Sequence, residues 1–307
     1  MYIQKVLVQE MIGRLLYSPA RWTLPNKTLD DVQYLAVGHL SKDVSSAGHV
    51  AGGAVYYGAV TAGRLGIKPG ILTSCAPDFN FPREIRNWPI RYAESITTTT
   101  FENIYGCTND RTDRRQYVHD VADPISLDIL PESWRQASIL HLAPLLDEIP
   151  VQIIDLFPES LIVASIQGWT RRIGINGRIY ASSWEGLGVL PRIDVAICSR
   201  QDAYSEDDIV HWSNLARVLI VTNGSHGVTV YSGESVFELE SLNVTEIDPT
   251  GAGDVFSAAF AVRFFETGNL LESSDFASVV AGLSVRSQGV SAIPYKKEVE
   301  LFRQKHL

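Results

Sequence analysis

The sequence predicts an α/β fold in which a doubly wound, mainly parallel sheet carries helices on both faces. Three observations support this prediction. Short apolar segments of strand length recur along the chain, helix-compatible segments separate them, and glycine-containing turns follow several of them. This alternation is typical of parallel sheets, because two parallel neighbouring strands need a crossover connection, which is usually a helix.

Length, charge and cysteine content narrow the classes of function. The 307 residues suffice for one large α/β domain. The chain holds 26 Lys and Arg against 35 Asp and Glu, a formal net charge of −9, which argues against a nucleic-acid partner. Three cysteines without CxxC spacing predict neither a disulfide framework nor a zinc site. With no apolar run of membrane-spanning length, we expect a cytoplasmic protein that does not bind membranes.

Residues 1–33 are predicted to form an N-terminal extension that precedes the main domain. Ile3, Leu7, Met11 and Leu15 recur every four positions, a spacing compatible with a short amphipathic helix. Packing against the main domain is the simpler interpretation of this segment. The alternative is that it forms an arm that contacts another molecule. The sequence does not assign a role to residues 1–33.

The main domain is predicted to extend over residues 34–307, without an independent second domain. Its first part, "YLAVGHL", "GGAVYYGAVTAGRLG" and "PGILTSC", follows the strand, helix and strand order of a βαβ unit. Later apolar runs predict buried strands at 137–143, 161–166, 195–199 and 218–223, with helix-compatible spans at 147–158 and 205–216. Residues 97–119 place Thr, Phe, Ile and Tyr around a polar centre, which predicts a hairpin beside the main sheet.

The stretch "DPTGAGDVFSAAF", residues 248–260, is the strongest local signal for chemistry. Pro249 and the glycines delay the helix, and apolar residues at 256, 260 and 264 predict that a buried helix begins near Gly253. A helix N-terminus preceded by glycines can bind an anion through free amides and the helix dipole. Asp254 would then be placed to accept a proton from a hydroxyl that attacks a phosphate. The simpler alternative is that Asp254 only stabilises the helix dipole.

Two other glycine-marked turns predict ligand contacts. "VTNGSHG" places Thr222, Gly224 and Gly227 at a strand end, where an open α/β sheet usually binds its ligand, and a nucleotide would fit there. Near the start of the domain, Asp43 follows a strand and Gly52-Gly53 precede a helix. A carboxylate can accept hydrogen bonds from a polyol, and a glycine pair lets a ligand reach the backbone. The alternatives are an ordinary turn residue and an ordinary helix entrance.

In their order along the chain, these segments resemble the ribokinase or pfkB family of sugar and nucleoside kinases. "DPTGAGDVF" carries the specific part of the resemblance, and "AGGAVYYGAVTAGRLG" a looser part. Together with "VTNGSHG" and "SQGVSAIP", the resemblance extends over residues 34–294. It implies a ribokinase-like fold and a carbohydrate kinase that uses ATP and Mg²⁺.

The resemblance also implies roles for individual residues. Asp254 would be the catalytic base, and Gly251, Ala252 and Gly253 would form the anion hole for the transferred phosphate. The acceptor would bind at Asp43, Gly52 and Gly53. The nucleotide site would include Thr222, Gly224, Gly227, Thr250, Ser284 and Gly289.

Two departures from the family pattern affect these roles. The family's usual Asn-x-x-Glu motif corresponds here to "CSRQDA", which offers Ser199 and Asp202. Asp202 is therefore the one candidate metal ligand, and metal handling is in question. Tyr57 stands where many members have an Asn that contacts the sugar.

The third departure is the short interval between Asp43 and Gly52, which predicts a small, reduced β lid formed largely by residues 97–119. This segment and "QGWTRR" resemble the branch of the family that includes inositol kinases. Arg115 and Gln167 are accordingly candidate acceptor contacts. The protein is expected to be a monomer or a homodimer.

Three hypotheses of function follow. The leading one is an ATP-dependent kinase that phosphorylates a hydroxyl of a small sugar or cyclitol. A nucleoside kinase is the alternative among enzymes, since Tyr56, Tyr57 or Trp169 could stack on a base. A degenerate kinase that acts as a ligand sensor is the alternative outside enzymes, because Ser199 and Asp202 depart from the family motif.

Overall fold

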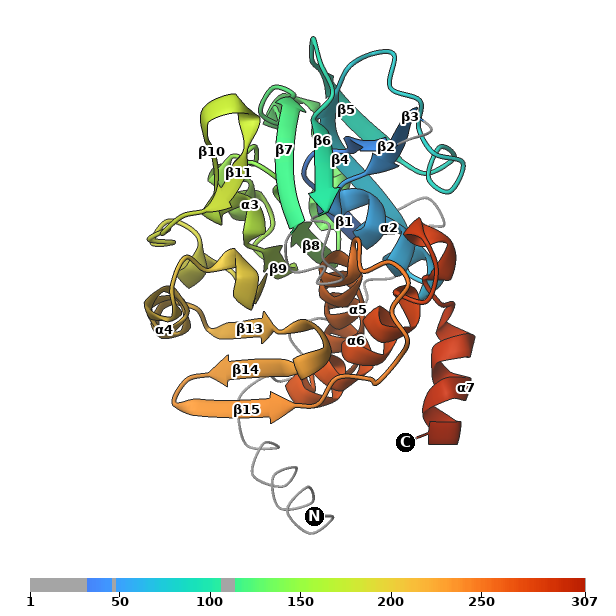
Figure 1. Cartoon of the computed structure of the whole chain (residues 1–307), viewed down its shortest axis with the longest axis vertical. Helices are drawn as coiled ribbons and strands as arrows, with labels where there is room; N and C mark the ends of the chain where they lie inside the picture. The colour runs from blue at the N-terminus through green and yellow to red at the C-terminus, as the bar shows by residue number, and fades with distance from the viewer. Residues whose placement is uncertain (1–31, 46–47, 106–113, 307) are drawn as a thin grey trace.

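The computed structural model describes residues 32–45, 48–105 and 114–306 (Figure 1). A nine-stranded sheet in the order β15-β14-β13-β12-β9-β8-β1-β4-β5 forms its centre. Neighbouring strands from β13 to β5 pair in parallel, whereas β14 and β15 pair antiparallel. The strands are β1 (Tyr34–Val37), β4 (Pro69–Cys75), β5 (Ile90–Glu94), β8 (Ile139–Leu142), β9 (Leu161–Ser165), β12 (Val195–Ser199), β13 (Val218–Thr222), β14 (Val228–Ser232) and β15 (Ser235–Leu239).

Helices and 3₁₀ turns cover both faces of this sheet, which confirms the predicted doubly wound architecture. Alternate residues of β1 point to opposite faces: Tyr34 and Ala36 enter one buried cluster, and Leu35 and Val37 enter the other. The first cluster includes α2 (Ala54–Arg64), α5 (Ala252–Thr267) and α6 (Leu270–Ser284). The second includes α4 (Glu206–Leu215) and the 3₁₀ turns at Glu132–Gln136, Val151–Leu156 and Leu190–Arg192. The remaining helices are α3 (Gln167–Thr170) and α7 (Lys296–His306).

A second sheet, which we call the lid, lies beyond the main sheet in the order β3-β2-β6-β7 (Figure 1). Its strands β6 (Thr100–Tyr105) and β7 (Arg114–Asp120) form an antiparallel pair, as expected of a hairpin in this region. The strands β2 (Ser41–Ser45) and β3 (Gly48–Gly52) were not expected from the sequence. They form because β2 pairs with β6, a contact between distant parts of the chain that no local pattern reveals.

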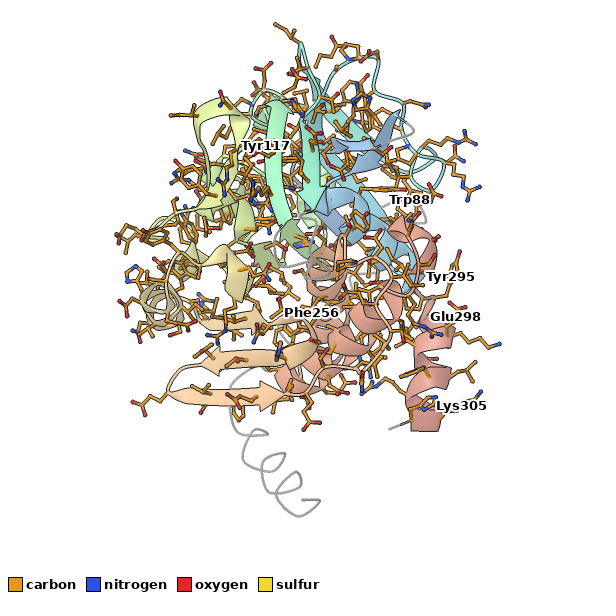
Figure 2. All side chains as sticks on the ribbon, in the orientation of Figure 1. Trp88, Tyr117, Phe256, Tyr295, Glu298 and Lys305 are labelled. Atoms are coloured by element: carbon orange, nitrogen blue, oxygen red, sulfur yellow. The ribbon has the colours of Figure 1, made fainter. Side chains whose placement is uncertain are left out.

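A short hairpin extends the lid on its other side. β10 (Arg171–Ile173) pairs with β11 (Ile179–Ala181), and Arg178 next to β11 forms a bridge with Tyr117 of β7. Figure 2 labels Tyr117 on this lid strand and Phe256 on α5, the helix that begins at the glycine-rich motif. The β6–β7 hairpin of the lid is therefore paired with β2 on one side and bridged to the 171–181 segment on the other.

The predicted helix over 147–158 is wrong. Only a 3₁₀ helix forms there, at Val151–Leu156, because Pro150 and Pro158 leave too few residues between them for a stable α-helix. The predicted extension lies outside the described residues up to position 31. Val32 already packs in the core at 2% exposure. Within the described ranges, no helix is long and apolar enough to cross a membrane.

Candidate active site

The glycine-rich motif forms the N-terminus of α5, as the sequence predicted. Gly251 is the residue before the helix, with φ at 79°, a left-handed conformation that favours glycine. No side-chain oxygen of the described residues caps this helix end. Asp254 is the third residue of the helix and is half-buried. The Ala252 N–H donates to the Pro249 carbonyl at 3.1 Å, and the next amide, that of Gly253, lies beside the Asp254 carboxylate at this helix end.

Asp248 holds this loop in place, and the sequence did not single it out. Its carboxylate accepts hydrogen bonds from the backbone N–H of Thr250 at 3.0 Å and of Gly289 at 3.2 Å. Its own backbone N–H donates to the carbonyl of Val285, just past α6. Its position as the first acidic residue of the glycine-rich motif was the one feature of the sequence that could have indicated this role. Asp248 therefore ties the glycine-rich loop to the turn that starts at Gly289.

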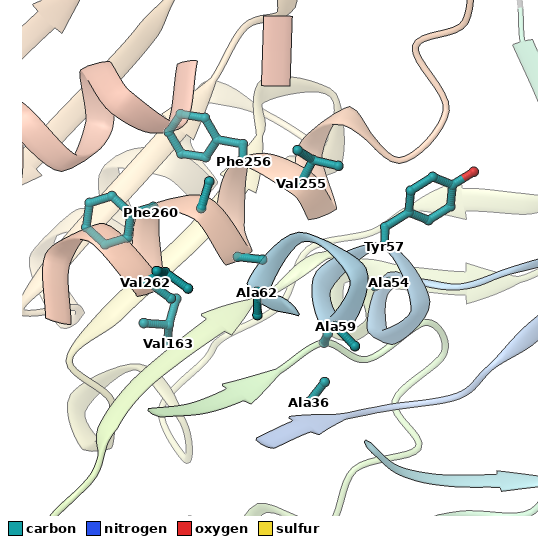
Figure 3. Packing of buried hydrophobic residues seen from close by; sticks show 14 of the residues in the cluster. Ala36, Ala54, Tyr57, Ala59, Ala62, Val163, Val255, Phe256, Phe260 and Val262 are labelled. Carbon is teal, nitrogen blue, oxygen red and sulfur yellow. The ribbon is translucent and has the colours of Figure 1, made fainter. Parts of the chain in front are cut away.

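Tyr57 of α2 lies against the same helix end. A Cβ atom placed on Gly251 would be 2.3 Å from Cδ1 of Tyr57, so the aromatic ring is in direct contact with the Gly251 α-carbon. Figure 3 shows the ring projecting from the first turn of α2 past Ala54, away from the packed alanines. Tyr57 is only 6% exposed. The contact joins the N-terminal ends of α2 and α5.

Burial and three carboxylate charges act on the phenol of Tyr57. Burial is the main cause that raises the pKa of Tyr57 well above its usual range. The negative charges of Asp43, Asp248 and Asp254 raise this pKa further, since each opposes ionisation of the phenol. The Tyr57 hydroxyl therefore remains protonated at neutral pH and is available as a hydrogen-bond donor.

The predicted acceptor residues meet at the junction of the lid and α2. Asp43 lies within β2, opposite Val50 of β3, and not after a strand as predicted. A Cβ on Gly52 would be 2.5 Å from Oδ2 of Asp43, so the carboxylate would have to turn aside for any larger residue. Gly53 has φ at 101°, and a Cβ there would be 2.6 Å from the His39 carbonyl oxygen. The backbone therefore requires glycine at 53, whereas Gly52 leaves space for the present position of the Asp43 carboxylate.

Of the predicted nucleotide-binding residues, two glycines face open space, and three other residues contact their own surroundings in the fold. Gly224 has φ at 54°, Gly289 has φ at 59°, and no described atom lies within 4 Å of where a Cβ would stand on either. In contrast, Gly227 packs on the Leu239 carbonyl and is required by the turn itself. The Thr222 hydroxyl donates to the Cys198 carbonyl at 3.3 Å, and the Ser284 hydroxyl donates to the Ala281 carbonyl at 2.8 Å.

Asp202 and Gln167 are bonded to each other. The Gln167 side-chain amide donates to Oδ1 of Asp202 at 2.7 Å, and the Ser199 backbone N–H donates to Oδ2 at 2.8 Å. Asp202 thus completes a capping box at the end of β12 and links it to the end of β9. Each of its oxygens accepts one of these hydrogen bonds, and its role as a metal ligand stays a prediction.

The remaining predicted features of the site are Arg115 and a bound metal ion. Arg115 lies on β7 opposite Ile104, with an exposed side chain, and its role as an acceptor contact stays a prediction. Among the described residues, no three His, Cys, Asp or Glu side chains form a cluster that could hold a metal ion.

Comparison with known proteins connects this geometry to kinases. Residues 190–297 match the pfkB family carbohydrate kinase pattern. A ribokinase of Bacillus subtilis is 40% identical over 83 residues, which cover 27% of this chain and 28% of that protein. Such matches span between 28% and 35% of the length of the first curated relatives.

Solved structures show a likeness over most of the chain. A pyrophosphate-dependent kinase in the ribokinase family, complexed with a pyrophosphate analog and myo-inositol, superposes with a TM-score of 0.71 and 24% identity. The superposition covers 87% of this chain and 99% of that one. Arabidopsis thaliana ribokinase complexed with ribose and ATP gives a TM-score of 0.68 at 18% identity, covering 88% and 98%. These likenesses show that the fold is ribokinase-like.

Proposed function

We propose that this chain, which carries a pfkB carbohydrate kinase segment in a ribokinase-like fold, transfers a phosphoryl group to a hydroxyl of a small sugar or cyclitol. The observation that carries the proposal is the start of α5. There, a helix N-terminus, a glycine that faces open space and a half-buried carboxylate meet at one point.

The amides around Gly251, Ala252 and Gly253 are proposed to bind the transferred phosphoryl group. A helix N-terminus favours negative charge, and the N–H groups of its first turn have no partner within the helix. Gly253 faces open space, since no described atom lies within 4 Å of where its Cβ would stand. A phosphate oxygen can therefore approach the backbone from that side.

Asp254 is proposed to act as the base. It would take the proton of the acceptor hydroxyl as the hydroxyl oxygen forms a bond to phosphorus. The bond between phosphorus and the bridging oxygen of the donor breaks, and the remainder of the donor leaves with the electron pair of that bond. Asp43, with Gly52 and Gly53, would place the acceptor by accepting hydrogen bonds from its other hydroxyls.

The donor is proposed to be ATP with Mg²⁺, bound beside Thr222, Gly224, Thr250, Ser284 and Gly289. The open faces of Gly224 and Gly289 support this side of the site for phosphates. Mg²⁺ would neutralise phosphate charge during transfer. Because one structural neighbour is described as pyrophosphate-dependent, the donor test includes pyrophosphate.

A transfer assay tests the proposal. ATP or pyrophosphate is supplied with Mg²⁺ and with ribose, fructose, myo-inositol, adenosine or cytidine, and the phosphorylated product is detected by mass spectrometry. We expect product with a sugar or cyclitol. Product with a nucleoside alone would instead support the nucleoside kinase alternative.

Asp254→Asn keeps the size of the side chain and removes the base, so turnover should fall by about 10²- to 10⁴-fold while donor binding persists. Glu266→Gln, an acid near the other end of α5, is the matched control and should keep its turnover. Unchanged turnover in Asp254→Asn would overturn the base assignment. Tight donor binding without product from any acceptor would favour the sensor alternative.

A further inference from the structure

Tyr57 occupies a position between the two halves of the proposed site. Its ring lies on the α-carbon of Gly251, where an added Cβ would approach ring atoms Cδ1, Cε1 and Cγ within 2.3–2.6 Å. Gly253, two residues further on, faces open space. The loop that would bind the phosphoryl group is therefore covered by an aromatic ring at one glycine and open at the other.

The covered side is the acceptor side. Tyr57 stands four residues after Gly53, on the helix that continues directly from β3 of the lid. The charge of Asp43 acts on its phenol, and so does the charge of Asp254. The Tyr57 ring thus stands where an acceptor hydroxyl would reach the base, and where water would compete with that hydroxyl.

The neighbouring tyrosine, Tyr56, belongs to the same buried cluster and has a hydrogen-bond partner for its hydroxyl. Tyr56 is equally buried at 6% exposure, and its hydroxyl donates to Oε2 of Glu84 at 3.1 Å. Figure 3 shows the Tyr57 hydroxyl directed away from the apolar cluster that the rest of α2 enters. The two residues share a helix, a residue type and a degree of burial, so Tyr56 is a matched control for Tyr57.

We propose that Tyr57 couples donor cleavage to the acceptor: its ring excludes water from the anion hole, and its hydroxyl donates a hydrogen bond to the acceptor. This inference rests on the proposed kinase function and adds a positioning residue to it. The ring keeps water away from the anion hole, and an acceptor with an oxygen in reach of the phenol occupies the position that water would otherwise take. The acceptor class that fits is a polyol with a C–H face that can pack on the ring and a hydroxyl beside it.

The competing reaction that Tyr57 suppresses is hydrolysis of the donor. In hydrolysis, a water molecule takes the place of the acceptor and Asp254 takes its proton. The water oxygen bonds to phosphorus, the bond to the donor's bridging oxygen breaks, and inorganic phosphate is released. Shielding the site from water prevents such side reactions. The ratio of hydrolysis to transfer therefore measures what the ring does.

The experiment measures donor hydrolysis without acceptor, transfer with acceptor, and the acceptor KM in wild type, Tyr57→Ala, Tyr57→Phe and Tyr56→Phe. In Tyr57→Ala, the hydrolysis-to-transfer ratio should rise by about tenfold or more, equivalent to ~1.4 kcal/mol between the two barriers. In Tyr57→Phe, the ring remains, so the ratio stays near wild type. Its acceptor KM should rise by about two- to tenfold, the value of one neutral hydrogen bond. Tyr56→Phe should match wild type in both quantities.

Each part of the inference has an outcome that overturns it. An unchanged ratio in Tyr57→Ala overturns the role of the ring, and an unchanged KM in Tyr57→Phe overturns the role of the hydroxyl. Tyr57→Phe loses only an oxygen, so it keeps the inference testable if Tyr57→Ala does not fold. A wild-type chain that transfers no phosphoryl group overturns the kinase proposal itself, which is a different result from an active wild type with unaffected variants.

Discussion

Replacing Gly251 with alanine tests the contact on which the site is built, and we expect it to destabilise the fold by about 2 to 5 kcal/mol. Two costs add up to this value. The left-handed backbone at φ 79° costs a non-glycine residue about 1–2 kcal/mol. The new Cβ would also stand 2.3 Å from Tyr57, and such overpacking typically costs about 1–3 kcal/mol.

The assay is equilibrium unfolding in urea, followed by tryptophan fluorescence and by circular dichroism. With a denaturant slope of about 3 kcal/mol per molar urea, this destabilisation lowers the midpoint by about 1 M. Tyr57→Ala has its own cost, since it truncates a buried side chain, but in that background Gly251→Ala should carry only the backbone cost. The two substitutions should therefore be coupled by about 1–3 kcal/mol, in the direction of rescue.

Gly253→Ala is the control for this prediction. Gly253 lies inside α5 and faces open space, so alanine should leave stability unchanged or raise it by up to about 1 kcal/mol. Transfer should nevertheless fall, because the added methyl group occupies the space proposed for the phosphoryl group. Strict additivity between Gly251→Ala and Tyr57→Ala would refute the steric reasoning. Equal stability losses at the two glycines would refute it as well.

Two further predictions concern buried groups outside the motif. His141 is fully buried between Tyr34 and Ser165, and burial lowers its pKa from 6.5 to about 4. Stability should be fully present above pH 6.5 and should be lost as the pH falls toward 4, by up to ~3 kcal/mol, because the unfolded chain binds the proton first. Urea unfolding at pH 7, 5.5 and 4 measures this loss, and in His141→Gln the free energy of unfolding should depend less on pH. An equal dependence on pH in wild type and His141→Gln would contradict the prediction. Arg64 donates to the backbone carbonyls of Val290, Ser291 and Ile293, so Arg64→Met should cost about 1.5–3 kcal/mol. Arg64→Met should also weaken ATP binding, measured by calorimetry, because the turn that starts at Gly289 loses this support. Unchanged stability in Arg64→Met would show that the contacts with these carbonyls do not stabilise the fold.

The main sheet and the start of α5 were predictable because their signals are local. Apolar runs bounded by turn residues gave β8, β9, β12 and β13 to within two or three residues. Proline and glycine in "DPTGAGDVF" placed the helix start near Gly253, and α5 begins at Ala252. In each case, the residues that form the element also carry the pattern that predicts it.

Other parts of the site depend on contacts between distant segments. Asp43 is placed by the pairing of β2 with β6, which the sequence around Asp43 does not encode. Gln167 and Asp202, whose roles as acceptor contact and metal ligand stay predictions, form a hydrogen bond across two strand ends that neither local sequence reveals. The ring of Tyr57 reaches Gly251 only because α2 packs on α5. Residue type identified these positions as polar or unusual, but only tertiary packing defines their partners.

The glycines of the site separate what the fold needs from what a ligand needs. Gly53, Gly227 and Gly251 have positive φ and lie against backbone or ring atoms that a Cβ would strike, so the fold accounts for them. Gly224 and Gly289 face open space but have positive φ, so their backbone accounts for them as well.

Gly253 meets neither condition, because it is helical and no described atom stands within 4 Å of where its Cβ would be. A helix prefers alanine to glycine by about 1 kcal/mol, so the fold alone would favour a substitution there. The remaining physical reason for glycine at 253 is the space beyond it, at the helix N-terminus and beside Asp254. A ligand in that space would be anionic, and Gly253→Ala separates its binding from folding more cleanly than any other change in the motif.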